Sequence, residues 1–350
     1  MRIVLAFDSF KGCITASEAC DVAARGILTA KPDAEVIEVP LSDGGEGLVS
    51  CVRMMLPTST VSIEVHGPLM EKVVADYALS SDGKTAYMEM AAASGLTLVP
   101  QDKRNPMLTT TYGVGEMITD AIRRGCKHII MGIGGSATCD GGRGMVEALR
   151  DNNILNKPYK LTVACDVTNP LYGENGAAHI FAPQKGATPE QVLILDEQLR
   201  SFARETEAAG VATPALVDYP GVGAAGGLGY ALLAYLKGEL HSGIDIVLDL
   251  ARFDEAIYDA DLVITGEGRS DPQTLMGKVP HGVLKRCQKA GVPIWLISGA
   301  IDDASGSLAN AFDLVKSINE RDTRNLEELI KPDVANENMR KTMTRLFNKK

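Results

Sequence analysis

Aromatic side chains are scarce in this chain of 350 residues: Phe, Trp and Tyr together make up 5% of it, although 45% of the residues are hydrophobic. A core with so few aromatics must be built from Ala, Val, Ile and Leu, the mixture typical of parallel sheets that helices cover on both faces. We therefore expect an α/β fold. The length suffices for one large domain or two of medium size.

Long apolar runs, an excess of positive charge and paired cysteines are also missing. No apolar stretch approaches the roughly 18 residues of a membrane-spanning helix, and the N-terminus has no signal-peptide pattern. The net charge of -10 opposes general binding to nucleic acid or anionic membranes. Seven cysteines without a C-x-x-C pair suit reduced thiols, and the five histidines lack zinc-ligand spacing. We expect a cytoplasmic protein without nucleic-acid or membrane partners.

Short β-branched runs recur six times, and each ends in small residues that are joined by acidic ones in five of the six. In open α/β sheets, ligands bind outside the carboxyl ends of the strands. The pattern therefore predicts a site assembled from segments that lie far apart in the sequence. The expected strands cover residues 3–7, 36–41, 129–131, 161–164, 262–265 and 294–297, and the polar clusters follow at 8–12, 42–47, 132–144, 165–170, 266–271 and 298–300.

Helical patterns lie between most of these strands. Thr15 and Glu18 have the spacing of a capping box at a helix start, and residues 112–124 place apolar side chains at helical intervals. Residues 61–90 instead show strands and turns, with Asp82-Gly83 as a plausible hairpin tip.

This interruption of the βα rhythm predicts two domains. Residues 1–60 and 255–350 are expected to fold together as a Rossmann-like domain with a parallel sheet, and residues 61–254 as a second, dissimilar α/β domain. The active site is expected in the cleft between them. The pattern does not decide to which domain residues 105–150 belong.

The most informative motif is the glycine-rich stretch 132–144, which has six glycines in thirteen residues and links a predicted strand to a predicted helix. Such a loop can present bare backbone N–H groups to an anion, and the helix adds its positive end. We interpret it as a phosphate site. A tight turn that needs several positive φ values is the structural alternative.

Two other functions compete for this loop. Gly132-x-Gly134-x-x-Ala137 matches a dinucleotide fingerprint, which would suit an NAD-dependent dehydrogenase, but no acid for the ribose is cleanly placed after the next strand. The loop is also more polar than such a turn requires. A catalytically silent nucleotide or metabolite sensor on the same scaffold is the other alternative.

Acidic loops next to glycine loops favour Mg²⁺ chemistry on a phosphate, since carboxylates and water are the ligands that this cation selects. Phosphoryl transfer further needs a phosphate cradle, a cation and a base. A Walker A loop is absent, because Gly277-Lys278 is followed by Val279 and no glycine precedes it at the required spacing. The available loop cations are Lys11, Arg104, Lys185, Arg269 and Lys278.

Taken in order, these motifs resemble those of the type-I glycerate kinases along nearly the whole chain. Phe7, Cys139, Ser270 and Pro272 depart from the usual family residues, and the stretch 150–160 looks shortened. The motifs that carry the resemblance are residues 8–11, 42–47, 89–96, 104–106, 132–142, 164–171, 183–189, 223–227 and 264–269, followed by Asp271, Gln273-Thr274, Gly277-Lys278 and Pro280.

The resemblance implies ATP-dependent phosphorylation of D-glycerate in two dissimilar α/β domains, with 2-phosphoglycerate and ADP as expected products. The sequence leaves the choice between the 2- and 3-hydroxyl groups open. ATP and Mg²⁺ are the expected cofactors, glycerate and ATP the expected partners, and a homodimer is a candidate assembly.

Each candidate residue follows from its chemistry in this reaction. We expect catalysis from Lys11, Asp43, Arg269 and Asp271, with Asp43 or Asp271 as the base and Arg269 suited to the carboxylate of glycerate. A loop-capping role is the alternative for each acid. The other candidates are Gly134, Gly135, Ser136, Thr138 and Lys278 for ATP, Asp8, Ser9, Arg104 and Glu267 for the substrate, and Asp140 or Asp166 for the metal.

Overall fold

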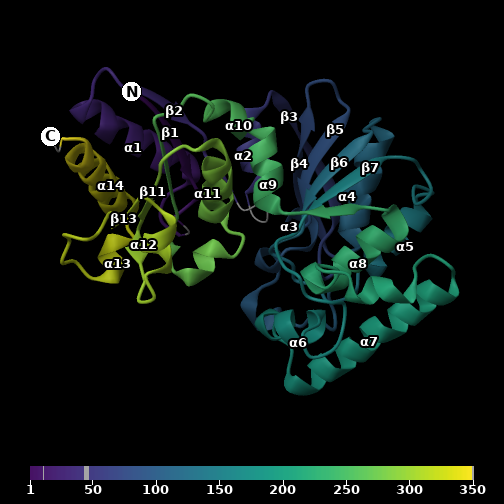
Figure 1. Cartoon of the computed structure of the whole chain (residues 1–350). Coiled ribbons are helices and arrows are strands. Elements are labelled where there is room, and N and C mark those ends of the chain that lie inside the picture. Colours follow the sequence, from purple (N-terminus) through teal and green to yellow (C-terminus); the bar gives the residue numbers. More distant parts are fainter. Residues whose placement is uncertain (11, 43–46, 349–350) are drawn as a thin grey trace. The chain divides into compact units, whose positions relative to one another are not determined.

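The computed structural model describes residues 1–10, 12–42 and 47–348. It divides into two compact units: unit 1 contains residues 1–43 and 244–350, and unit 2 contains residues 44–243. Both units are α/β (Figure 1). The α/β class predicted from the composition is thereby confirmed.

Unit 1 is built on a parallel sheet of five strands in the order β13-β11-β9-β1-β2. Numbered along unit 1 alone, this is the order 2-1-3-4-5 of a doubly wound sheet, which changes direction between β1 and β9. Loops that follow β1 and β9 therefore diverge at the switch point and leave room for a ligand. The strands are β1 (Arg2–Phe7), β2 (Glu35–Glu38), β9 (Leu262–Gly266), β11 (Ile294–Ser298) and β13 (Leu314–Ser317).

Helices cover both faces of the unit 1 sheet (Figure 1). Helix α1 (Ala16–Ala30) begins with the predicted capping box of Thr15 and Glu18, and it packs with α14 (Pro332–Phe347) over one face of β1. Helix α11 (Val279–Ala290) contacts β1, β9 and β11 on the other face. The remaining elements of unit 1 are α10 (Phe253–Ala256), β10 (Arg269–Ser270), η5 (Pro272–Leu275), β12 (Ala300–Ile301), α12 (Ser307–Ala311) and α13 (Leu326–Leu329), and α9 (Gly243–Leu250) begins at the last residue of unit 2.

Unit 2 contains a mixed sheet of six strands in the order β3-β4-β5-β6-β7-β8. The first three strands run antiparallel and the last four run parallel, with Asp82 and Gly83 in the predicted turn between β4 and β5. The strands are β3 (Thr58–His66), β4 (Lys72–Ser80), β5 (Thr85–Glu89), β6 (His128–Gly132), β7 (Lys160–Ala164) and β8 (Glu239–His241).

The unit 2 helices enclose an aliphatic core with few aromatics, as the composition predicts. The predicted helix at 112–124 is present as α4, which packs against α5. The connection from α5 to β7 is only eight residues long, residues 152–159. The helices are α2 (Leu48–Met55), α3 (Ala91–Ser94), α4 (Tyr112–Arg123), α5 (Arg143–Asp151), α6 (Ala177–Phe181), α7 (Pro189–Ala208) and α8 (Ala224–Leu236), with η1 (Leu96–Leu98), η2 (Gln101–Lys103), η3 (Pro183–Lys185) and η4 (Pro214–Asp218) between them.

The chain crosses between the units earlier than the sequence suggests. Residues 47–60 belong to unit 2, because α2 packs on β3, β4 and β5. Residues 244–254 belong to unit 1, where Ile244 packs over Gly282 and Asp245 pairs with Arg286 at 3.3 Å. The undecided residues 105–150 lie in unit 2.

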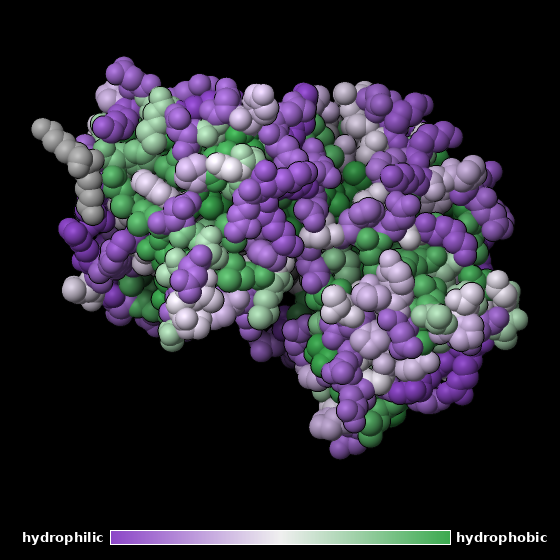
Figure 2. Space-filling view, viewed as in Figure 1, coloured by the Kyte–Doolittle hydropathy of each residue, from purple (hydrophilic) through white to green (hydrophobic). Residues whose placement is uncertain are grey.

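All six predicted strands exist, but they belong to two sheets. Four of them, β1, β2, β9 and β11, form part of the unit 1 sheet, whereas β6 and β7 lie in unit 2. Their polar clusters therefore follow the carboxyl ends of two separate sheets. No described helix is long and apolar enough to cross a membrane, and the face drawn in Figure 2 mixes hydrophilic with hydrophobic residues.

Candidate active site

Unit 1 has a cavity of about 500 Å³ at the carboxyl edge of its sheet. Loops after β1, β9, β11 and β13 all contribute to its wall, so the cavity lies at the switch point that the strand order creates. Polar residues form one part of the lining, namely Asp8, Ser9, Glu267, Arg269, Lys278 and Asn319. Four of the sequence-predicted substrate and catalytic residues thus meet here with the predicted ATP contact Lys278.

Glu267 fixes Lys278 in this lining. The Glu267 side chain is buried; its Oε1 accepts hydrogen bonds from the hydroxyls of Ser270 (3.1 Å) and Thr274 (2.6 Å), and its Oε2 lies 3.5 Å from Nζ of Lys278. A carboxylate with these partners orients a cation at the cavity wall. The arrangement therefore gives Glu267 a positioning role toward Lys278.

The remaining predicted residues of unit 1 are held in loops. The buried Asp8 accepts a hydrogen bond from the backbone N–H of Ser9 at 2.7 Å. Arg269 is exposed and pairs with Asp302 at 3.2 Å. Asp271 caps η5 by accepting from the N–H of Gln273 at 2.8 Å, and it is not part of the cavity lining. Lys11 and Asp43 lie outside the described residues.

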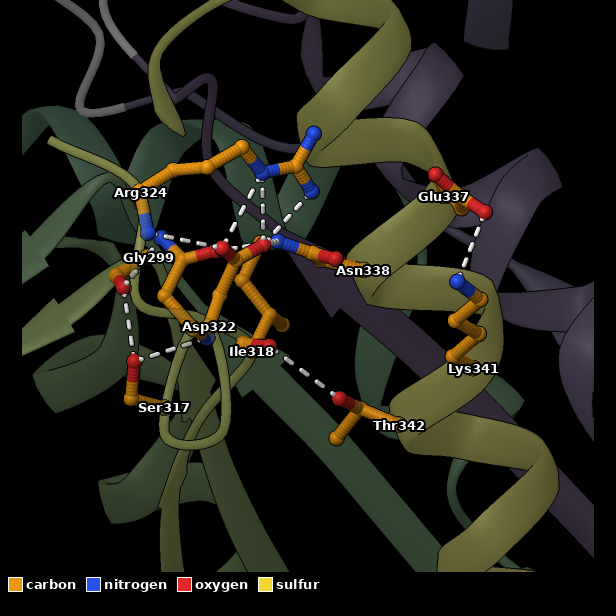
Figure 3. A network of polar contacts seen from close by, with 10 residues as sticks. Gly299, Ser317, Ile318, Asp322, Arg324, Glu337, Asn338, Lys341 and Thr342 are labelled. Atoms are coloured by element: carbon orange, nitrogen blue, oxygen red, sulfur yellow. Dashed lines mark hydrogen bonds and ion pairs between the residues drawn. The ribbon is translucent and has the colours of Figure 1, made fainter. Parts of the chain in front are cut away.

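A polar network links α14 to the loop after β13 (Figure 3) and includes the cavity-lining residues Gly299 and Asn319. The amide of Asn338 on α14 donates to Oδ1 of Asn319 and to Oδ2 of Asp322, both at 2.8 Å, and Asn319 donates to the carbonyl of Gly299 at 3.0 Å. Hydrogen bonds from Arg324 hold the pKa of Asp322 well below its usual range. The network ties the loop after β13 to α14 and to the loop after β11.

The glycine-rich loop of unit 2 covers residues 133–142 between β6 and α5. Gly135 has φ +72°, and the segment is anchored by bonds from Leu96 N–H to the carbonyl of Gly135 and from Ala137 N–H to the carbonyl of Ser94. Within the described part of the chain, no acceptor pairs with the N–H groups of Gly134, Gly135 and Ser136. These donors are therefore available to an anion.

A buried lysine supports the same loop. Lys185 is 2% exposed, and its ammonium group donates to Oγ of Ser136 at 2.6 Å and to the carbonyl of Thr138 at 2.7 Å. No described carboxylate forms an ion pair with it. Burial lowers the pKa of Lys185 to about 8. The lysine thus fixes the loop and adds positive potential beside its free amides.

Arg104 and Thr138 adjoin this arrangement. Gly186, at φ +96°, lies so close to Arg104 that a Cβ atom there would overlap the Arg104 carbonyl. Among the described residues, neither Nε of Arg104 nor the buried Oγ1 of Thr138 has a hydrogen-bond partner. Arg104, which was predicted to bind substrate, therefore lies next to Gly186, the residue that follows Lys185 in the sequence.

Asp140 is engaged by the loop itself. Its Oδ2 accepts hydrogen bonds from the N–H and hydroxyl of Thr111 and from the N–H of Gly144, and its Oδ1 accepts from Gly142 N–H. Four donors around one carboxylate match the capping alternative. Asp166 accepts from the hydroxyl of Ser242 and the N–H of Gly243. No group of three or more His, Cys, Asp or Glu in the described residues could hold a metal ion.

The loop geometry argues against the dinucleotide interpretation. That fingerprint places the helix start beside its last small residue. In unit 2, α5 begins only at Arg143, six residues after Ala137. The extra residues carry Asp140 and its capping bonds, and the segment 223–227 packs on them, because a Cβ at Gly226 would overlap the Thr138 carbonyl.

Two further polar residues had no role assigned from the sequence, one at the glycine loop and one at the start of α2. Lys185 appeared only as an available loop cation. Glu89, at the end of β5, accepts hydrogen bonds from the N–H groups of Gly47 (2.5 Å) and Leu48 (3.2 Å) at the start of α2. Both residues lie in motifs of the family resemblance, 183–189 and 89–96, and this is the signal that points to them.

A cavity at the switch point of one α/β unit, together with a glycine loop that presents backbone N–H groups in the other, is typical of α/β enzymes that act on phosphorylated ligands. A sequence model of the glycerate kinase family matches residues 3–158 and 150–349. The chain belongs to the glycerate kinase family and is a kinase. The kinase class excludes the dehydrogenase interpretation.

Individual relatives agree with this result. The chain is 45% identical to the glycerate 2-kinase of Escherichia coli (strain K12), over 87% of each chain. It is 43% identical to the glycerate kinase of Bacillus subtilis (strain 168), over 91% of this chain and 90% of that one. A crystal structure assigned as glycerate kinase 2 from Salmonella typhimurium LT2 matches with a TM-score of 0.84 at 40% identity, over 99% and 97% of the two chains.

Proposed function

We propose that this enzyme transfers the terminal phosphoryl group of ATP to the 2-hydroxyl group of D-glycerate and releases 2-phosphoglycerate and ADP. The observation that carries the proposal is that no acceptor in the described part of the chain pairs with the backbone N–H groups of Gly134, Gly135 and Ser136, which adjoin the buried ammonium of Lys185. Such a cradle suits a phosphate chain. The relative named glycerate 2-kinase supports both the acceptor and the choice of hydroxyl.

The roles of the side chains follow from their charge and geometry. Arg269 offers a planar pair of donors to the carboxylate of glycerate, and Lys278, oriented by Glu267, offers a point charge to phosphate oxygens. Asp8, Ser9 and Arg104 are proposed to contact glycerate. Lys11 is proposed to bind the oxygens of the phosphoryl group while it is transferred. Asp43 or Asp271 is proposed to take the hydroxyl proton.

Mg²⁺ is proposed to neutralise charge on the phosphates. Kinases commonly bind this ion through one or two carboxylates and the substrate phosphates, so a preformed cage of protein ligands is not required. Both predicted ligands are engaged within unit 2 or at its edge, Asp140 by four donors and Asp166 by Ser242 and Gly243, so each would need to exchange a partner for the ion. Replacing each aspartate with Asn and titrating Mg²⁺ tests this: a metal ligand raises the Mg²⁺ concentration for half-maximal rate, whereas a capping residue leaves it unchanged.

The decisive experiment is phosphorus NMR of the product formed from ATP, Mg²⁺ and D-glycerate. We expect equal amounts of ADP and 2-phosphoglycerate. A 3-phosphoglycerate signal would correct the acceptor position and retain the kinase. ATP binding without turnover of D-glycerate would overturn the proposed acceptor.

A further inference from the structure

The unit 1 cavity has an aliphatic part that the proposed chemistry leaves unused. Unlike the polar lining residues Asp8 and Lys278, the residues of this part have aliphatic side chains. They are Ile318, Leu326, Leu329, Ile330 and Ala335. These residues come from the segment after β13 and from α13 and α14. In Figure 2, hydrophobic residues reach the surface in the part of unit 1 where Figure 1 draws α12 and α13.

Two members of this aliphatic wall are exposed. Leu326 is 71% exposed and Ile330 is 48% exposed, although both line a cavity. Exposed aliphatic side chains around a hollow gain stability when an apolar ligand surface covers them. Glycerate is a three-carbon acid that carries oxygen on every carbon, so it offers no such surface.

The size of the cavity also indicates a ligand larger than glycerate. Its volume of about 500 Å³ lies within the range of roughly 300–1,000 Å³ that holds a ligand of drug size. A nucleoside has an aromatic base with apolar faces and a polar end that continues into phosphates. The cavity lining offers both kinds of group, because it contains aliphatic side chains as well as the cation Lys278.

We infer that the aliphatic wall of residues 318, 326, 329, 330 and 335 binds the adenine base of the nucleotide. The inference depends on the proposed function for the choice of ATP. The base packs against Leu326, Leu329 and Ile330, and the phosphate end of the nucleotide reaches Lys278, the lining residue proposed above to contact phosphate oxygens. The hydrogen bonds from Asn338 to Asn319 and Asp322 join α14, which carries Ala335, to the loop that begins after Ile318.

Substitution of the exposed wall residues provides one test. Leu326→Asp and Ile330→Asp each put a charge where the base would lie, and their exposure limits the effect on folding. We expect the KM for ATP to rise at least fivefold and the KM for glycerate to change less than twofold. Leu193→Asp and Ile194→Asp on α7, with 64% and 49% exposure, are matched controls that should leave both constants unchanged.

Cys13 offers a test that does not require turnover. It lines the cavity and is partly exposed, as is Cys165 in unit 2, whereas the other five cysteines are buried. We expect ADP and adenosine to slow alkylation of Cys13 and to leave Cys165 unaffected, each site being compared with its own rate in the free protein by peptide mass spectrometry. D-glycerate alone should protect neither thiol.

The outcomes separate this inference from the proposed function. If the chain phosphorylates glycerate but adenosine fails to protect Cys13, or the wall variants raise only the KM for glycerate, the adenine site is wrong and the kinase proposal stands. Protection of Cys13 by adenosine without phosphoryl transfer would support the adenine site and overturn the proposed function.

Discussion

The unit 1 cavity and the glycine loop of unit 2 offer a ligand different kinds of chemical group. The unit 1 cavity presents side chains, both charged and aliphatic, around a hollow of about 500 Å³. The glycine loop of unit 2 presents backbone N–H groups, and the buried ammonium of Lys185 donates to Ser136 within the same loop. A side-chain site depends on what its residues are, whereas a backbone site depends on the φ and ψ angles that surrounding residues impose.

This difference determines how each part should respond to mutation. In unit 1, a substitution of similar shape can remove one chemical function and leave the fold intact. In unit 2, the recognition groups cannot be mutated directly, so only the residues that shape the loop can be changed. Loss of activity there should accompany loss of loop geometry.

The largest effect is expected from Asp271→Asn in unit 1. Asn caps helix starts about as well as Asp, so the free energy of unfolding should change by only a few tenths of a kcal/mol. If Asp271 is the base, kcat should fall by about 100-fold or more. Steady-state kinetics with ATP and D-glycerate measures this.

Asp303→Asn is the control for that variant. Asp303 also holds a helix start, by accepting from the N–H groups of Leu308 and Ala309 at α12, and it does not line the cavity. Its kcat should match that of the unmodified enzyme. Near-normal turnover of Asp271→Asn would leave Asp271 with its capping role alone.

Lys185→Met should produce the second largest loss. It removes the donor to Ser136 and Thr138 and the positive charge beside the free amides, so we expect kcat/KM to fall about 10²–10³-fold, as for the loss of one preorganised donor. Lys237→Met is the control, because Lys237 also donates to two carbonyls in unit 2 but is exposed at the end of α8. Equal activity of the two variants would remove Lys185 from the anion site.

Sequence patterns with local causes predicted the structure well. Capping boxes, the Asp82-Gly83 turn and β-branched runs act through neighbouring residues, so all six strands and the helix at 112–124 are where they were expected. The polar residues after β1 and β9 meet at one cavity because parallel strands end at a common edge.

Contacts between distant residues could not be obtained in this way. Asp140 is surrounded by donors that include Thr111, 29 positions earlier, and the burial of Lys185 depends on packing that no local pattern encodes. The points where the chain passes from one unit to the other lie elsewhere than the sequence pattern suggests. The membership of α2 depends on the sheet against which it packs, and that of α9 on the helix against which it packs, and neither contact is encoded locally. The aliphatic wall likewise comes from a C-terminal segment with no recognisable motif.

Gly226→Ala tests whether the glycine loop of unit 2 depends on its backbone geometry, and the quantity measured is the free energy of unfolding. Gly226 has φ +68°, and a Cβ there would overlap the carbonyl of Thr138, which Lys185 holds. Gly210 has φ +69° with open space around it, so Gly210→Ala incurs only the left-handed strain of about 1 kcal/mol. We expect Gly226→Ala to lower the free energy of unfolding by about 2 kcal/mol more than Gly210→Ala does. Equal denaturation midpoints would mean that the loop adjusts freely.

The smallest effect concerns pH and follows from the lowered pKa of Lys185. With a pKa of about 8 in the folded enzyme, the ammonium form is lost as the pH rises past 8. If this form serves the anion, kcat/KM should fall about tenfold between pH 7 and 9, and the residual activity of Lys185→Met should lack this decline. A pH profile of both proteins measures the difference.

The free energy of unfolding should rise over the same pH range in which kcat/KM falls. The unfolded lysine keeps its proton up to about 10.5, so between pH 8 and 10.5 the unfolded chain binds more protons than the folded one. The contribution of Lys185 to the free energy of unfolding therefore rises with pH, because the folded state no longer holds a buried charge. Denaturant titrations at pH 7 and 9 should show this rise as an excess over Lys185→Met. An activity decline that instead follows a fall in stability would result from unfolding and not from the lysine.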